Sequence, residues 1–83
     1  KGEIHINENA AKALTGEKAV SLLPVGALKI VGDFEKDDIV KIVDPTGKSL
    51  GIGKAQYDSI KATEILGKKN QKPLIHCDYM YLE

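Results

Sequence analysis

Three consecutive residues near the C-terminus, His76, Cys77 and Asp78, are the side chains in this sequence best suited to chemistry. A cysteine beside a histidine can act as an activated nucleophile when the two side chains are within hydrogen-bond reach. We expect these residues to lie in a strand, where neighbouring side chains point to opposite faces and the pair is kept apart. The sequence therefore predicts no catalytic centre here. It predicts instead that His76 and Asp78 satisfy hydrogen bonds at the end of the fold.

A metal centre is not predicted either. Cys77 is the only cysteine, so it cannot form an internal disulfide, and the spacing around it does not match a zinc site. Asp37 and Asp38 offer adjacent carboxylates, but no third ligand lies at a useful spacing. We interpret them as a solvated turn, in which an aspartate can adopt the left-handed backbone conformation.

Three glycines, Gly47, Gly51 and Gly53, superficially resemble a phosphate-binding run. Nucleotide-binding fingerprints require such glycines in a turn between a strand and a helix. Here the glycines lie within and beside a predicted strand, where they let another backbone pass close or let the strand bend sharply. No cofactor site is therefore predicted in this chain.

The elements that position these residues are short. Between Val20 and Tyr57, bursts of apolar residues alternate with turn formers and charges, which is typical of a small antiparallel sheet that curls into a barrel. Asn7 and Asp58 are good helix N-caps, and each precedes a run of apolar residues at helical spacing. The sequence predicts a mainly β fold with two short α-helices, in the order β-α-β-β-β-α-β. The predicted strands lie at 3–6, 28–31, 38–44, 49–56 and 74–82, the last with a kink at 77–78, and the helices end at Gly16 and Gly67.

The charge balance argues against strong binding of nucleic acid. The chain contains 12 lysines, no arginine and 12 acidic residues, so its formal net charge is zero. Nucleic-acid affinity depends largely on neutralising phosphates, and arginine supplies bidentate and stacking contacts that lysine lacks. Lys68, Lys69 and Lys72 form a small basic loop, which we interpret as solvated surface. A local basic patch assembled from several elements stays open as an alternative.

Length and composition limit the possible functions. A chain of 83 residues makes one domain with little room for a deep active site, which argues against a self-contained enzyme. Because the chain begins with Lys1, we expect it to be processed or excised from a longer chain. No apolar run approaches the roughly 20 residues of a membrane span, and no secretory signal is visible. The single cysteine fits a reducing, cytoplasmic setting.

A set of motifs occurs in a fixed order along the central stretch: Ser-Leu-Leu-Pro-x-Gly-Ala, x-Val-x-Gly-x-Phe, a charged turn, Ile-Val-x-Ile and Gly-x-x-x-Gly-x-Gly. This order resembles the PUA domain, the small β-barrel module of pseudouridine synthases and archaeosine transglycosylases. With NAAKAL before it and QYDS and IHCDYM after it, the chain looks like the C-terminal PUA domain of the bacterial glutamate 5-kinase family. The resemblance covers residues 2–80. It implies a PUA-like pseudobarrel in which 1–83 is a single PUA domain, with an N-terminal kinase domain absent from this chain.

The resemblance also implies a parent enzyme that uses ATP and Mg²⁺ to phosphorylate the γ-carboxylate of glutamate, the first step of proline synthesis. That chemistry would lie outside this chain, which is expected to be non-catalytic. The expected role of the domain is to tune the assembly or regulation of its enzyme, with its own kinase domain and other protomers as partners. Two alternatives are an RNA-binding module and a self-association module that uses a sheet edge or an apolar patch.

For the RNA-binding alternative, the resemblance names a surface. In RNA-binding PUA domains, the loop that corresponds to Leu23–Ala27 and the helix before it face the nucleic acid. The nucleic-acid-binding residues predicted in this way are Pro24, Val25, Gly26, Ala27, Lys29 and Lys54. Convergence of Lys29, Lys54 and the 68–72 loop beside Gly26 would favour RNA binding. The other interpretation is that Pro24 and Gly26 only shape the first turn of the barrel.

The sequence departs from the family pattern at two places. Cys77 stands where arginine is common, which removes a cation from the last strand. About ten residues are missing after Ser59, a length that a surface loop can lose without a change of fold. The first departure weakens the prediction of an RNA or anion site, and the second puts in doubt any partner contact that the missing segment would make.

Overall fold

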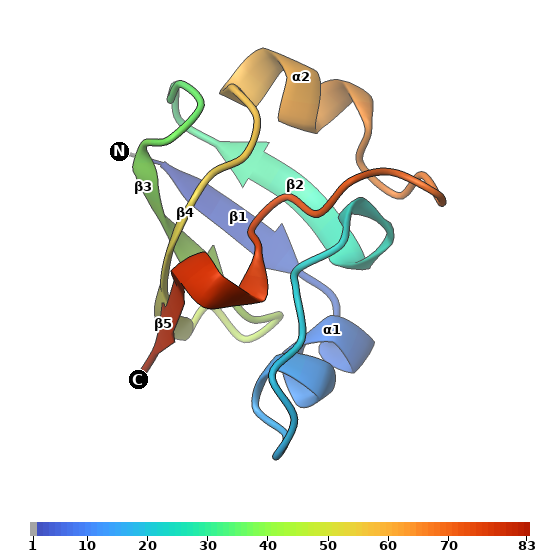
Figure 1. Cartoon of the computed structure of the whole chain (residues 1–83), viewed down its shortest axis with the longest axis vertical. Coiled ribbons are helices and arrows are strands. Elements are labelled where there is room, and N and C mark those ends of the chain that lie inside the picture. Colours follow the sequence, from blue (N-terminus) through green and yellow to red (C-terminus); the bar gives the residue numbers. More distant parts are fainter. Residues whose placement is uncertain (1) are drawn as a thin grey trace.

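The computed structural model describes residues 2–83. Strands and helices follow one another in the predicted order, and two 3-10 turns are added, one before the second strand and one before the fifth (Figure 1). The predicted fold class is confirmed. The elements are β1 (Glu3–Ile6), α1 (Glu8–Leu14), η1 (Pro24–Gly26), β2 (Ala27–Val31), β3 (Ile39–Val43), β4 (Ser49–Lys54), α2 (Ser59–Glu64), η2 (Cys77–Tyr79) and β5 (Met80–Leu82).

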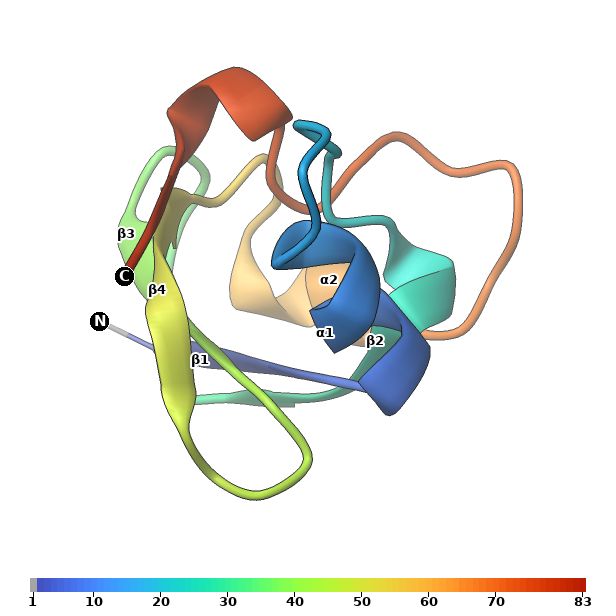
Figure 2. The ribbon, with the colours of Figure 1, turned by 90° about the horizontal axis from the view of Figure 1, so that it is seen from below.

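The strands form one mixed sheet in the order β2-β1-β3-β4-β5. β1 runs parallel to β3, and the other neighbouring strands are antiparallel. The sheet curls around a single core, with α1 and α2 at opposite ends of the barrel (Figures 1 and 2). Alternation along the strands builds that core: Ile4 and Ile6 of β1 and Val40 and Ile42 of β3 are at most 1% exposed. Full burial of such a side chain stabilises the fold by about 1.5–3 kcal/mol.

Backbone hydrogen bonds between two loops close the open side of the barrel. Leu22 donates its N–H to the carbonyl of Ile75 at 2.9 Å and accepts the N–H of Leu74 at 2.7 Å. Gln56, just after β4, donates its N–H to the carbonyl of Leu74 at 2.8 Å. Leu22, Leu74 and Ile75 are all at most 1% exposed, so these bonds run through the core. The loop before η1 is thereby tied to the segment before η2.

Both helices begin at the predicted caps. The side chain of Asn7 accepts the N–H of Ala10, and that of Asp58 accepts the N–H of Lys61, each at 2.8 Å. Each bond satisfies a first-turn N–H group that has no partner within the helix. Both helices end earlier than predicted, because the C-caps are Thr15 in α1 and Ile65 in α2 and not Gly16 and Gly67.

The last predicted strand differs most from the structure. Residues 77–79 form the 3-10 turn η2, so only Met80–Leu82 pair with β4 as β5. The kink expected at residues 77 and 78 is therefore a complete turn. His76 caps this turn, because its Nδ1 accepts the N–H of Asp78 at 3.1 Å.

The glycines of β4 let β5 and the segment before η2 approach closely, as the sequence predicts. A Cβ atom on Gly51 would meet the Tyr81 carbonyl and would lie 2.7 Å from the Cα of Leu82, and Gly51 has a φ of +154°. A Cβ atom on Gly53 would lie 2.6 Å from the side chain of Ile75. Both contacts are too close for any residue other than glycine without a shift of the neighbouring strand.

We predict that Gly51→Ala lowers the free energy of unfolding by about 2–3 kcal/mol, because the new methyl group must push β5 off the sheet. Gly47→Ala is the matched control. Gly47 also has a positive φ, +89°, but a Cβ atom there would meet no atom within 4 Å. Its cost should be limited to the strain of the backbone, about 1 kcal/mol. Urea unfolding of both variants checks this, and equal losses would contradict the close approach of β5.

Candidate functional site

The loop predicted to face nucleic acid is fixed on two sides. Gly26, at the end of η1, accepts the N–H of Asn7 at 2.8 Å, which joins η1 to the start of α1. Pro24 accepts the N–H of Gly67 at 2.8 Å, which joins η1 to the loop after α2. The turn therefore has a defined position between the two helices.

The predicted nucleic-acid-binding residues do not share one surface. Pro24 and Ala27 are buried, Gly26 is half-buried, and Val25 is 44% exposed. Lys29 is exposed on β2. The loop therefore exposes Leu23, Val25 and part of Gly26, whereas Pro24 and Ala27 belong to the packed side of the turn.

A groove of about 450 Å³ lies between α1 and the loop that precedes β2. A Cβ atom on Gly26 would lie only 2.7 Å from the Cβ of Ala10, so the glycine and the alanine allow α1 to lie close to η1. The groove has no charged lining residue; it is lined by Asn7, Asn9, Ala10, Ala13, Leu14, Val20, Ser21, Leu22, Leu23, Val25 and Gly26.

The lysines that would build an RNA surface lie on different elements of the fold. Lys29 lies on β2 and Lys54 on β4, and β1 and β3 lie between these two strands in the sheet. Lys54 is engaged locally: its Nζ lies 3.9 Å from a carboxylate oxygen of Asp37 and 4.9 Å from the ring centre of Tyr79. The basic loop at 68–72, by contrast, directly follows the residue that is bonded to Pro24. The convergence of all three groups beside Gly26 is not found.

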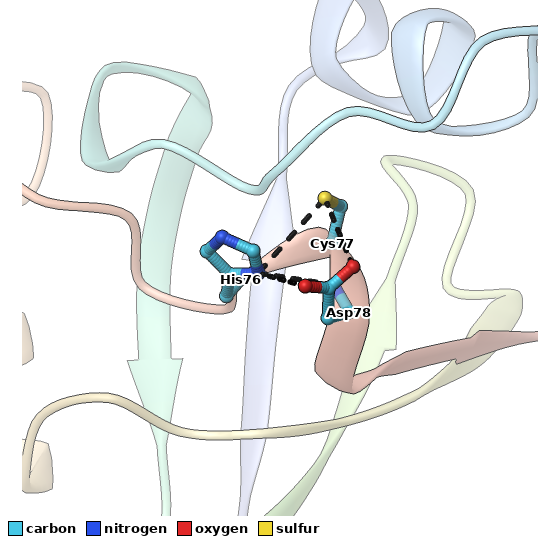
Figure 3. Close-up of side chains that lie close together, drawn as sticks. All are labelled: His76, Cys77 and Asp78. Carbon is cyan, nitrogen blue, oxygen red and sulfur yellow. Dashed lines mark hydrogen bonds and ion pairs between the residues drawn. The ribbon is translucent and has the colours of Figure 1, made fainter.

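The structure brings together the side chains of His76, Cys77 and Asp78, which the sequence analysis expected to be kept apart (Figure 3). That expectation is wrong because residues 77–79 adopt a 3-10 turn and not an extended strand. The Cys77 Sγ lies 3.9 Å from the His76 Nδ1 and 3.9 Å from the Asp78 Oδ1. The His76 Nδ1 lies 3.6 Å from the Asp78 Oδ2. The predicted structural role of His76 is confirmed by its cap on η2.

The paired carboxylates form the expected turn. Asp37 has a φ of 78°, and its N–H donates to the Ala55 carbonyl at 2.7 Å. Asp38 accepts the N–H of Glu35 at 2.9 Å. These bonds fix the backbone between β2 and β3, so both aspartates have a structural role in the turn.

The hairpin between β3 and β4 contains the carboxylate with the clearest electrostatic perturbation. The hydroxyl group of Thr46 and the backbone N–H of Lys48 both donate to Asp44, at 2.7 and 2.9 Å. These hydrogen bonds hold the pKa of Asp44 below its ordinary value. The turn between β3 and β4 is therefore built around Asp44.

Within residues 2–83, no helix is long and apolar enough to cross a membrane. The family model for the PUA domain matches residues 2–76.

The chain belongs to the PUA domain family.

The chain is also similar to segments of glutamate 5-kinases. The chain is 57% identical to a segment of the glutamate 5-kinase of Bacteroides thetaiotaomicron, with all of the chain and 23% of that protein covered. It is 45% identical to the glutamate 5-kinase of Chlorobaculum tepidum, with 99% of the chain and 23% of that protein covered. The resemblance stated from the sequence is confirmed. The chain spans about a quarter of the length of these relatives.

Solved structures of other PUA domains share the fold. A PUA domain from Aeropyrum pernix, solved as a tartrate complex, matches with a TM-score of 0.81 and 23% identity over 92% of the chain and 41% of that protein. A chain of the archaeal box H/ACA sRNP Nop10–Cbf5 complex matches with a TM-score of 0.69 and 20% identity, over 99% of this chain and 23% of that one. At these identities the likeness concerns the fold alone.

The contact between α1 and η1 of this PUA domain can be tested by a double-mutant cycle. We predict that Gly26→Ala costs about 1–3 kcal/mol, because the new methyl group forces α1 away. In an Ala10→Gly background the same change should cost clearly less, since its nearest neighbour is gone. Gly16→Ala, whose new methyl group would have no neighbour closer than 3.5 Å, serves as control. Additive losses in urea unfolding would contradict the close approach that shapes the groove.

Proposed function

We propose that this chain is the accessory PUA domain of an enzyme of the glutamate 5-kinase type and acts through contacts with the rest of that enzyme. The observation that carries the proposal is 57% identity over the whole chain to a segment that makes up 23% of a glutamate 5-kinase. The parent enzyme would phosphorylate the γ-carboxylate of glutamate with ATP and Mg²⁺ in the cytoplasm. Its kinase domain would precede this one.

The groove between α1 and η1 supports a role without catalysis. Its lining offers backbone, amide, hydroxyl and aliphatic groups but no acid or base. General acid–base catalysis requires a titratable side chain within hydrogen-bond reach of the reacting group. Phosphoryl transfer also requires cations around the phosphates. The groove is therefore suited to hold an uncharged segment of a partner and not to transfer a phosphoryl group.

A second surface supports contact with a partner protein. On the outer side of β4 and β5, Ile52 is paired directly with Tyr81, so their side chains lie next to each other. Ile52 is 41% exposed and Tyr81 is 63% exposed. We name these two residues the β4–β5 surface. Exposed aromatic and aliphatic side chains in contact are typical of protein interfaces. The occupant we propose is the remainder of the kinase chain, because the relatives carry about three quarters of their length outside this domain.

A chimera tests the proposal. The PUA segment of the Bacteroides thetaiotaomicron glutamate 5-kinase is replaced with this chain, and we expect ATP-dependent phosphorylation of glutamate and the native oligomeric state to be retained. In that chimera, Ile52→Lys with Tyr81→Lys should weaken assembly about tenfold or more, because two desolvated charges would enter the interface. Sedimentation analysis and initial rates measure both properties.

Ile60→Lys in the same chimera is the matched control, since Ile60 is an apolar residue on α2 that is 73% exposed and far from the β4–β5 surface. It should leave assembly and rates unchanged. An inactive chimera that contains the folded domain would contradict the assignment to glutamate 5-kinase. Equal behaviour of the Ile60 and Ile52/Tyr81 variants would contradict the proposed surface.

RNA binding is the second candidate, and one observation favours it. The hydrogen bond from Gly67 to Pro24 places the basic loop at 68–72 beside the exposed Val25. A structural neighbour belongs to an H/ACA sRNP, a particle of RNA and protein. Three lysines can neutralise at most about three phosphates, which supplies only weak binding at physiological salt.

We predict that the 83-residue chain binds structured RNA no more tightly than about 10⁻⁴ M at physiological salt. Fluorescence anisotropy with a labelled hairpin RNA at two salt concentrations measures this. Micromolar binding that is lost in Lys68→Glu/Lys69→Glu, but kept in Lys54→Glu, would show a working RNA surface on the 68–72 loop. Lys54 is the control because it lies on β4, outside that loop, and its charge is paired with Asp37.

A further inference from the structure

We propose that His76, Cys77 and Asp78 together bind one divalent transition-metal ion of the zinc class. The three residues supply an imidazole, a thiol and a carboxylate, one ligand atom each, and these atoms all lie within 4.8 Å of one another (Figure 3). Among residues 2–83, these three residues form the group of three potential metal ligands whose ligand atoms lie this close together. The proposal is independent of the kinase assignment.

The spacing of the ligand atoms is close to that of a bound site. A zinc ion with bonds of about 2.0 Å to nitrogen and oxygen and 2.3 Å to sulfur holds tetrahedral ligand atoms about 3.3–3.6 Å apart. Here Sγ lies 3.9 Å from Nδ1 and 3.9 Å from one oxygen of Asp78, Oδ1, and Nδ1 lies 3.6 Å from the other oxygen, Oδ2. With one oxygen of Asp78 as the ligand, the three ligand atoms all lie within 4.8 Å of one another. Rotation of the Asp78 carboxylate, with small shifts of the other two side chains, would bring one oxygen, Sγ and Nδ1 to these separations.

The backbone that carries the ligands is already held in place. Ile75, the residue before the site, is bonded to Leu22 in the core. The N–H of Cys77 donates to the hydroxyl group of Ser21 at 3.0 Å, and the N–H of Tyr79 donates to the carbonyl of His76 at 2.9 Å. The ion would therefore bind to a formed turn and need not order a flexible loop.

The ligands are also accessible and chemically matched to such an ion. His76 and Cys77 are half-buried and Asp78 is exposed, so an ion can enter from solvent and keep one or more water ligands. A thiolate and an imidazole select zinc-class ions over Mg²⁺ and Ca²⁺, which prefer oxygen ligands.

Binding has a cost that makes it sensitive to pH. The Nδ1 of His76 accepts the N–H of Asp78 and must exchange that bond for the metal. The thiol of Cys77 must lose its proton, which goes to the solvent as the sulfur–metal bond forms. Affinity should therefore rise with pH, and binding should release protons into a weakly buffered solution.

Co²⁺ is the spectroscopic probe for the test, because a thiolate ligand gives it a charge-transfer band in the near ultraviolet. The reduced 83-residue chain, freed of metal by a chelator, is titrated with Co²⁺ and then with Zn²⁺. We expect one ion per chain, the charge-transfer band, and displacement of Co²⁺ by Zn²⁺. Cys77→Ser should abolish the band, and His76→Gln or Asp78→Asn should weaken binding about tenfold or more.

His5→Gln is the matched control. His5 is the other histidine, and its Nε2 lies 2.8 Å from a carboxylate oxygen of Glu3, but no thiol is nearby. The control should bind Co²⁺ as the original chain does. The proposal is overturned if no charge-transfer band forms, if one ion is bound per two chains, or if His5→Gln weakens binding as much as His76→Gln. Circular dichroism of each variant separates loss of binding from loss of fold.

Discussion

The backbone bridge between Leu22 and Ile75 is the constraint on which the rest of this domain depends. Within residues 2–83, the two edge strands of the five-stranded sheet, β2 and β5, are not paired with each other. Two loops complete the circuit instead, through bonds to the backbone of Leu22 from the segment at Leu74 and Ile75. Because these residues are buried, the bonds are shielded from water and breaking them would leave unsatisfied polar groups in the core. The closure joins parts of the chain that are more than 50 residues apart.

The uncharged groove and the turn that gathers His76, Cys77 and Asp78 both lie next to this closure. On one side, the loop that contains Leu22 continues into η1, which forms the uncharged groove with α1. On the other side, Ile75 leads into the turn that gathers His76, Cys77 and Asp78, and then into β5. Ser21 connects the two sides directly by accepting the N–H of Cys77. A partner bound at the groove and an ion bound at the turn would thus act on the same buried bridge.

Local sequence signals predicted most of the fold, because local chemistry determines those elements. Asn7 and Asp58 each cap a helix by a bond to the residue three positions ahead in the sequence. The glycines of β4 indicate that another part of the chain approaches closely, whichever part that is. The turn at Cys77 could not be predicted, since alternating residues in a short C-terminal segment fit a strand equally well. Its conformation depends on Ser21, 56 residues away. The separation of Lys29 from Lys54 likewise follows from strand order, which composition does not reveal.

Native-state hydrogen exchange of the Leu22 and Leu74 amides tests this account most directly. If the bridge holds the barrel closed, both amides exchange only by global unfolding, as slowly as the amides of β1 and β3. The N–H of Cys77 should be protected as well, but less strongly, because it lies nearer the surface. Fast exchange at Leu22 and Leu74, with β1 and β3 still protected, would show that the two loops open independently. The groove and the turn would then not share a common support, and the account would be wrong.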